Sequence, residues 1–366
     1  MPISNSFILV FTNILTVFGL VTLLKPKLTN RTSNSNLIIS HFLILLFCLF
    51  SFWGQDWFGY LSTYEYYHDT NEDSSHLEPF YLYLIQGHTV NYLHFRLIVW
   101  GAALLFVYLA VKRLKLNMNV ATYFFVITTL IWFSYGRVSL SMSIMMYGAT
   151  WLTTDKSKFS FKHLIIALLF ILLSCFLHKS AIWGAIIILL SYIFLFIPRI
   201  SITILLILFP LLLYFSSGLG TYFLDLEGSE EAFDSISSAQ FYLQDDKSML
   251  GIGARIAKYL EWFPKFITAY LCYKFIRRGT HSPNLIKLFC IIFFVNCLLS
   301  SIFLFNLGLN TDVVYSRFQR FGIIPMFVVL TYMYENCIMK KEIKYLTSLI
   351  LVSTFYSLIY SAYNQL

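Results

Sequence analysis

The chain has 366 residues, of which 58% are hydrophobic, 19% aromatic and only 12% charged, with a net charge of +8. Soluble domains carry about a quarter charged residues, so the composition excludes an ordinary soluble fold. Apolar runs of about 17 to 25 residues recur along the chain, and each is long enough to cross a hydrocarbon core of roughly 30 Å. These runs do not alternate as the strands of a transmembrane barrel do. The sequence therefore predicts an all-α polytopic membrane protein.

We predict about twelve transmembrane helices, which form a single integral membrane domain of residues 1–366. Their approximate ranges are 6–24, 37–54, 95–111, 119–135, 139–153, 163–177, 181–197, 201–215, 261–276, 286–305, 321–338 and 345–361. No basic residue precedes the first span, and a cluster of positive charge follows it at Lys25, Lys27 and Arg31. This pattern favours an uncleaved first helix whose amino terminus faces the periplasm.

With that start, most of the 26 Lys and Arg residues fall in loops facing the cytoplasm of a bacterial inner membrane. Both termini are then periplasmic. The positive charge anchors the inner face against membrane lipids, so it gives no support for a nucleic-acid partner. The six cysteines all lie in or beside spans, and their spacing suits neither a metal site nor a disulfide framework. We therefore expect no metal and no cofactor.

Two long periplasmic segments, 55–94 and 216–260, and a shorter one, 306–320, contrast with the short basic loops on the other face. Long segments of this kind are usually functional or disordered, and these are rich in aromatic residues. We predict a short interfacial helix over 78–86. The working end of the molecule is therefore expected at the periplasmic face.

The sequence "LHKSAIW" places His178 and Lys179 at a tight turn between two predicted spans, on the periplasmic side. Two interpretations remain open at this point. Lys179 can serve as a snorkelling anchor and His178 can merely mark the turn. Alternatively, His178 is functional, because a histidine next to buried spans titrates near neutral pH and suits acid–base work.

Four arginines lie on the same predicted face, which Lys and Arg normally avoid. Arg317 and Arg320 are three residues apart and share one face of a helix, while Arg137 and Arg255 lie beside other spans. Arginine binds phosphate through two parallel hydrogen bonds. This set predicts a site for an anionic ligand, with a diphosphate as the favoured candidate.

The order of these motifs resembles the EpsG-type branch of the Wzy-like bacterial O-antigen and exopolysaccharide polymerases. The matching pieces are "GQDWFGYLSTY" with Asp56 and Tyr60, "EPFYLYL" with Glu78, "YGRVSLSMSI" with Arg137, "LHKSAIW" with His178, and Arg317 with Arg320. The chain departs from the family pattern at Phe52–Trp53, where an arginine is common, and at Val138, where a glutamine is common.

The resemblance implies a GT-C-like membrane glycosyltransferase for lipopolysaccharide or other polysaccharide biosynthesis. It would join oligosaccharide repeat units carried on undecaprenyl diphosphate, as donor and acceptor, with a chain-length regulator protein as a further candidate partner. His178, Arg317, Arg320 and Glu78 are the implied catalytic residues. The implied substrate-binding residues are Arg137, Arg255, Asp56, Tyr60 and Tyr315.

Two other functions remain open at the level of the sequence. One is a glycosyltransferase that uses a sugar carried on a polyprenyl monophosphate. The other is a flippase or transporter of lipid-linked oligosaccharides. A transporter would carry charged residues and broken helices along a path through the bilayer, whereas the basic candidates here gather at one face.

Fusions to a reporter that is active only in the periplasm test the predicted topology. We expect activity for fusions after Ser238 and Asn364, and none after Lys158 and Arg278. Activity after Arg278 would contradict the assignment of Arg317 and Arg320 to the periplasmic face.

Overall fold

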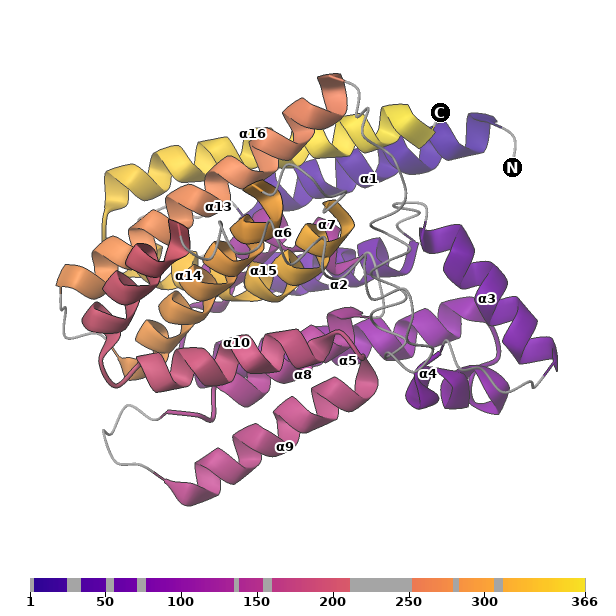
Figure 1. Cartoon of the computed structure of the whole chain (residues 1–366). Helices are drawn as coiled ribbons and strands as arrows, with labels where there is room; N and C mark the ends of the chain where they lie inside the picture. Colours follow the sequence, from indigo (N-terminus) through magenta and orange to yellow (C-terminus); the bar gives the residue numbers. More distant parts are fainter. Residues whose placement is uncertain are drawn as a thin grey trace, which may run out of the picture.

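The computed structural model describes residues 3–24, 34–50, 56–70, 77–134, 138–153, 160–210, 252–278, 283–305 and 312–365. These residues form helices, with no strand among them, as the sequence predicts. Figure 1 shows the longer helices packed side by side as a bundle.

The helices of the described residues have the following bounds. They are α1 (Ile3–Leu24), α2 (Asn34–Phe50), α3 (Asp56–Thr70), α4 (Pro79–Tyr83), a π-helical turn η1 (Leu84–His88), α5 (Tyr92–Arg113), α6 (Met118–Thr128), α7 (Leu130–Phe133), α8 (Val138–Ala149), α9 (Phe161–Leu177), α10 (Ala181–Phe194), a helix over Pro198–Pro210, α13 (Ile252–Arg278), α14 (Asn284–Phe305), α15 (Asp312–Glu335) and α16 (Lys340–Gln365). The predicted interfacial helix over 78–86 corresponds to α4 and the start of η1.

Helix α9 shows how the bundle meets its surroundings. Leu169, Leu172 and Phe176 are each at least 60% exposed and form one stripe, while Ala167 and Ile171 on the opposite side are buried. A helix on the surface of a soluble protein would expose polar residues instead. An apolar surface of this kind suits lipid, and the chain is therefore a membrane protein.

The lengths of the helices support the same conclusion in part. Among the described residues, Tyr92–Arg113 and Asn284–Ser301 are long and apolar enough to cross a membrane, and other apolar helices are 10 to 17 residues long. The predicted number of twelve spans stays a prediction.

Helix α8 is buried at every residue except Tyr147, and its Ser141 lies at the contact with α9. The Ser141 and Ser174 hydroxyl oxygens are 2.8 Å apart, and each hydroxyl lies 2.8–3.0 Å from the other residue's carbonyl oxygen. Near the other end of the contact, a Cβ atom on Gly148 would lie 2.9 Å from the Cβ of Phe170. The small residues therefore allow close contact between α8 and α9.

One end of the bundle, called the basic end here, is fixed by polar contacts between helix termini. Lys274 Nζ of α13 lies 3.4 Å from Glu342 Oε1 of α16. The backbone N–H of Asn117, before α6, donates to Glu335 Oε1 at 2.6 Å. A hydrogen bond from its own backbone N–H, together with Lys274, holds the pKa of Glu342 below its ordinary value.

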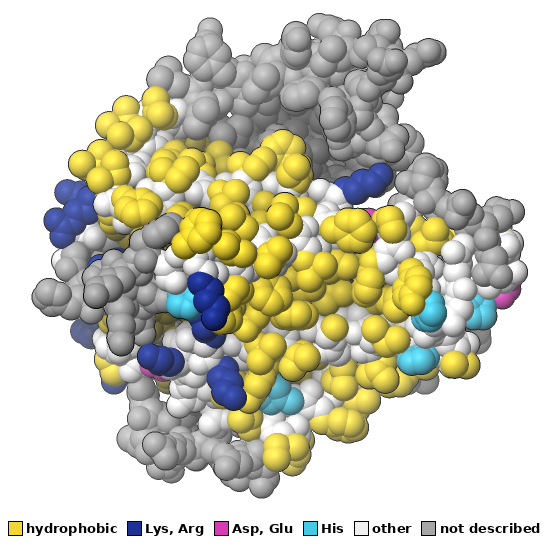
Figure 2. Space-filling view, turned by 90° about the horizontal axis from the view of Figure 1, so that it is seen from below, with side chains coloured by type: hydrophobic (Ala, Val, Ile, Leu, Met, Phe, Trp, Pro, Cys, Tyr) yellow, Lys and Arg dark blue, Asp and Glu magenta, His cyan; other side chains and the backbone are white. Residues whose placement is uncertain are grey.

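The opposite end, called the site end, carries α3, α4 and both chain termini (Figure 1). Figure 2 shows most of the Lys and Arg side chains of one face toward one end, several histidines toward the other, and a broad apolar band between them. This distribution matches a bundle whose two ends face water and whose middle faces lipid.

Substitution of Gly148 by alanine tests the contact between α8 and α9. The added Cβ collides with Phe170, so we expect Gly148→Ala to lower the free energy of unfolding by about 1–3 kcal/mol, measured by thermal denaturation in detergent. Gly101→Ala in α5 is the matched control, because its Cβ meets no atom within 4 Å. That change should be neutral or stabilising, since alanine favours helix. Equal losses for both variants would contradict the close packing.

Candidate functional site

Two of the predicted site residues, Glu78 and His178, lie together at the site end. Glu78 is the N-cap residue of α4 and is 7% exposed. His178 is the C-cap residue of α9, where an extended backbone ends the helix and begins the turn into α10. Glu78 Oε1 is 3.6 Å from His178 Nδ1. The fold therefore joins two candidates that are far apart in the sequence.

The turn after α9 also fixes the imidazole of His178. The backbone N–H of Ser180 donates to Nδ1 at 3.2 Å, and the Ser180 hydroxyl lies 3.0 Å from the same nitrogen. A nitrogen that accepts from a backbone N–H carries a lone pair, so the proton of the neutral ring lies on Nε2. The separation of 3.6 Å from Glu78 is also too long for a hydrogen bond. Neutral His178 is therefore a donor through Nε2.

Lys179 differs from its neighbour. Its side chain is exposed, whereas the side chain of His178 is 23% exposed and faces Glu78. Both interpretations of the pair therefore stay open, although the two neighbouring side chains lie in different surroundings.

Arg320 lies on α15, which begins at Asp312, well before the span predicted from residue 321. Arg317 and Tyr315 therefore belong to the same helix as Arg320. The Nε of Arg320 is buried and has no hydrogen-bond partner among the described residues. Buried polar groups in folded proteins are normally hydrogen-bonded, so this N–H lacks an acceptor in that part of the chain.

A close helix contact brings Arg320 to the same end as His178. Phe321, the next residue on α15, packs against Gly184 in the first turn of α10, and a Cβ on Gly184 would lie 2.5 Å from the Phe321 ring. Because α10 begins at Ala181, directly after the turn of His178, both side chains lie near the site end.

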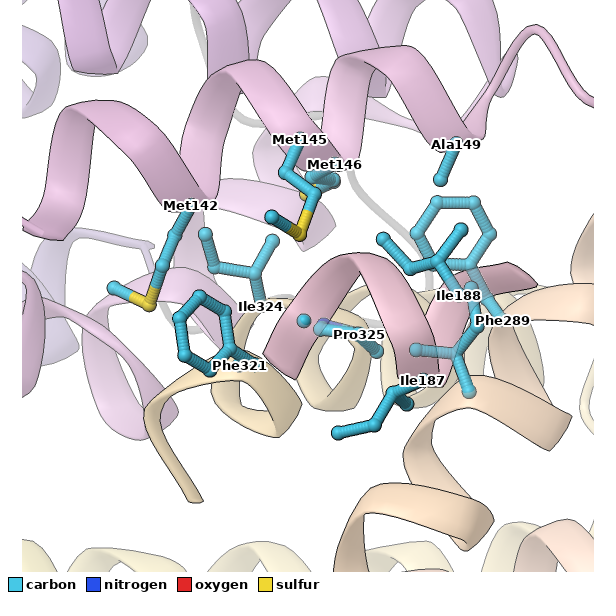
Figure 3. Close-up of a pocket in the computed structure, with 12 residues that line it drawn as sticks. Met142, Met145, Met146, Ala149, Ile187, Ile188, Phe289, Phe321, Ile324 and Pro325 are labelled. Carbon is cyan, nitrogen blue, oxygen red and sulfur yellow. The ribbon is translucent and has the colours of Figure 1, made fainter. Parts of the chain in front are cut away.

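The space on the bundle side of Phe321 is apolar. Figure 3 shows Met142, Met145 and Met146 of α8 facing Phe321 and Ile324 of α15 across a small cavity. The lining contains no charged residue. Ionic groups of a ligand would therefore be held at the site end and not drawn deeper between these helices.

The other predicted site residues are placed only in part. Asp56 and Tyr60 lie on α3, Arg255 on α13 and Tyr315 and Arg317 on α15, but their side chains lie outside the described set. Arg137 lies outside the described residues. Their predicted roles therefore stay predictions.

Sequence reasoning missed a buried ion pair on α13. Lys265 Nζ lies 2.5 Å from Glu261 Oε1, and the two side chains are only 10% and 19% exposed. The Lys265 ammonium also lies 5.6 Å from the centre of the Trp132 ring, near the end of α7. The spacing of opposite charges four residues apart inside an apolar span was the signal in the sequence.

A second missed residue is Arg96, which is 1% exposed on the first turns of α5. Its guanidinium donates to the carbonyl of Cys48 near the end of α2 and stacks 4.4 Å from the Trp100 ring. Trp100 Nε1 in turn donates to the carbonyl of Phe133 at 3.1 Å. Arg96 therefore ties the end of α2 to the end of α7, close to the segment that contains Arg137.

The sequence model of the EpsG family matches residues 33–366. No curated protein and no solved structure matches the chain.

Breaking the pair of Lys265 and Glu261 tests its contribution to stability. Lys265→Met leaves a buried carboxylate without its cation, and we expect a loss of about 3 kcal/mol in the free energy of unfolding. Lys274→Met is the matched control, because its pair with Glu342 is 32% and 43% exposed and should contribute about 1 kcal/mol or less. Thermal denaturation in detergent measures both, and a larger loss for Lys274→Met would contradict the burial argument.

Proposed function

Because this chain belongs to the EpsG family, we propose that it is a membrane glycosyltransferase that polymerises polysaccharide repeat units at the periplasmic face. The proposed donor and acceptor are oligosaccharides carried on undecaprenyl diphosphate, and O-antigen is the favoured polymer. The observation that carries the proposal is the buried Glu78 beside His178, at the same end of the bundle as the Arg320 guanidinium.

The proposed reaction transfers a glycosyl group between the two lipid-linked substrates. A hydroxyl of the acceptor sugar attacks the anomeric carbon of the donor, and a new bond between carbon and oxygen forms. The bond from the anomeric carbon to the diphosphate breaks, and the leaving diphosphate takes the electron pair. The proton of the acceptor hydroxyl must go to a base.

Glu78 is the proposed base, and His178 supports it. A carboxylate accepts a proton directly, whereas Nδ1 of His178 already accepts from Ser180 and its Nε2 carries a proton. This assignment differs from the expectation from the sequence, in which His178 was the first candidate for the base and Glu78 the second. His178 then donates from Nε2 to a sugar or phosphate oxygen and orients it for reaction.

Arg320 is the proposed stabiliser of the leaving group. Negative charge builds up on the diphosphate as the glycosidic bond breaks, and fixed donors aimed at that charge lower the barrier. The buried Nε of Arg320 is such a donor. Arg317, Arg137 and Arg255 are proposed to complete the site, with Asp56, Tyr60 and Tyr315 contacting the sugars.

Separate substitutions of Glu78 and His178 test which of the two residues is the base. We expect Glu78→Gln to reduce polymerisation of purified lipid-linked repeats by about 10²- to 10⁴-fold, because the amide cannot accept the proton. His178→Gln keeps a donor and should lose less. Lys179→Ala, next to His178, is the control and should stay near wild type. If His178→Gln proves far more damaging than Glu78→Gln, the histidine is the base.

Replacement of Arg320 by lysine tests the diphosphate site. Lysine keeps the charge but loses the planar fork, so we expect a large drop in polymer formation with membrane insertion unchanged. The same assay with a polyprenyl-monophosphate sugar as donor separates the proposal from the related glycosyltransferase reaction. Normal polymer length with Arg320→Lys, or activity with the monophosphate donor alone, would contradict the proposed substrate.

A further inference from the structure

A second polar cluster lies at the basic end, far from Glu78 and His178. Three helix ends meet there: the carboxyl end of α5 with Arg113, the turn after α8 with Thr150 and Trp151, and the first turn of α9 with His163. Helix α8 packs against both α5 and α9. The proposed reaction uses none of these residues.

Arg113 is held on two sides. Its guanidinium carbon lies 3.4 Å from the centre of the Trp151 ring, so the two planes are in contact. Its Nε donates to the carbonyl of Thr150 at 3.1 Å. The two terminal nitrogens of the guanidinium have no hydrogen-bond partner among the described residues. The protein therefore fixes the orientation of the Arg113 guanidinium but gives its two terminal nitrogens no acceptor among the described residues.

Two ring nitrogens beside this guanidinium are also without partners. Trp151 Nε1 and His163 Nδ1 are buried, and neither has a hydrogen-bond partner in the described part of the chain. The two rings meet edge to face, with their centres 5.4 Å apart. Buried polar groups in folded proteins are normally hydrogen-bonded, so this cluster lacks an acceptor.

The charges around the cluster favour an anion. Lys112 and Lys162 flank it and are exposed. On the same end, the carboxylate of Glu335 accepts from the backbone of Asn117, and that of Glu342 pairs with Lys274. Those two acids are therefore engaged elsewhere, and the charged residues that adjoin the cluster in the described part of the chain are the cations Lys112 and Lys162.

The apolar surface next to the cluster indicates what kind of molecule carries the anionic group. Phe161, two residues before His163, is 68% exposed, and Ile165 is 42% exposed. On α5, Leu105 and Tyr108 are 54% and 41% exposed. Exposed apolar residues therefore begin directly beside the polar cluster, which is the arrangement that a phospholipid meets with its headgroup and acyl chains.

We propose that Arg113, Trp151 and His163 bind the phosphate of an anionic phospholipid in the leaflet that the sequence predicts to be cytoplasmic. The two terminal nitrogens of Arg113 donate to two phosphate oxygens. Trp151 Nε1–H and the Nδ1–H tautomer of His163 donate to the remaining oxygens. The acyl chains lie along the exposed apolar stripe of α9.

Lipid titration of the purified full-length protein in detergent tests this site. Phosphatidylglycerol should raise the thermal unfolding temperature in a saturable way, whereas phosphatidylcholine and inorganic phosphate should not. Arg113→Met keeps apolar contact with Trp151 but removes the fork, and should weaken phosphatidylglycerol binding by about tenfold or more. Lys112→Met, on the same helix end, is the control and should change binding less than about twofold.

Trp151→Phe gives an independent measurement if Arg113→Met unfolds the protein. It retains a ring beneath the guanidinium and removes only the indole N–H, so binding should weaken while the protein stays folded. If Lys112→Met weakens phosphatidylglycerol binding as much as Arg113→Met does, binding depends only on general positive charge at this surface. That result would overturn the proposal. If inorganic phosphate stabilises the protein as much as phosphatidylglycerol does, the site binds a soluble anion, and the proposal of a phospholipid ligand is wrong.

Discussion

The close contact between α8 and α9 is the constraint on which both polar clusters depend. Lipid tails are as apolar as leucine, so helices in a bilayer gain little from burying apolar surface against each other and rely on close packing and on hydrogen bonds. The serine pair of Ser141 and Ser174 supplies the hydrogen bonds, and Gly148 allows the close approach. The two ends of α9 then fall beside fixed partners: His178 near Glu78 and His163 near Trp151.

The residues of the candidate site show how the free-energy cost of burying a charged side chain constrains the fold. Glu78 is almost fully buried, and an isolated carboxylate in that position would be expensive to keep ionised. Its Oε1 lies 3.6 Å from Nδ1 of His178, and its side chain makes no cap hydrogen bond to α4. Lys265 and Glu261 reduce this cost by pairing, because each of these two buried charges lies beside an opposite one. Arg320 is different, since its buried Nε has no partner within the described protein.

Much of this arrangement was predictable from local patterns. The position of His178 in a turn follows from two basic residues inside a long apolar run, and the packing of α8 follows from its spaced serines. The pairing of Glu78 with His178 was not predictable, because nothing in either segment indicates which distant turn it meets. Arg96 and Lys265 were overlooked since each lies within a run that is apolar on average, and averaging over a window hides a single charge. The tautomer of His178 depends on one backbone N–H, which no sequence pattern reports.

The turn that follows α4 has a consequence for the evolution of the chain. Gly87 adopts φ 142° and ψ 1°, a conformation that residues with a Cβ avoid at a cost of about 1–3 kcal/mol. A Cβ there would meet no neighbouring atom within 4 Å, so the penalty comes from the backbone alone and no repacking nearby relieves it. Every single-nucleotide change of a glycine codon that alters the residue introduces a Cβ or a stop. Each single-nucleotide change that replaces Gly87 is therefore expected to lower the stability of the segment that carries Glu78.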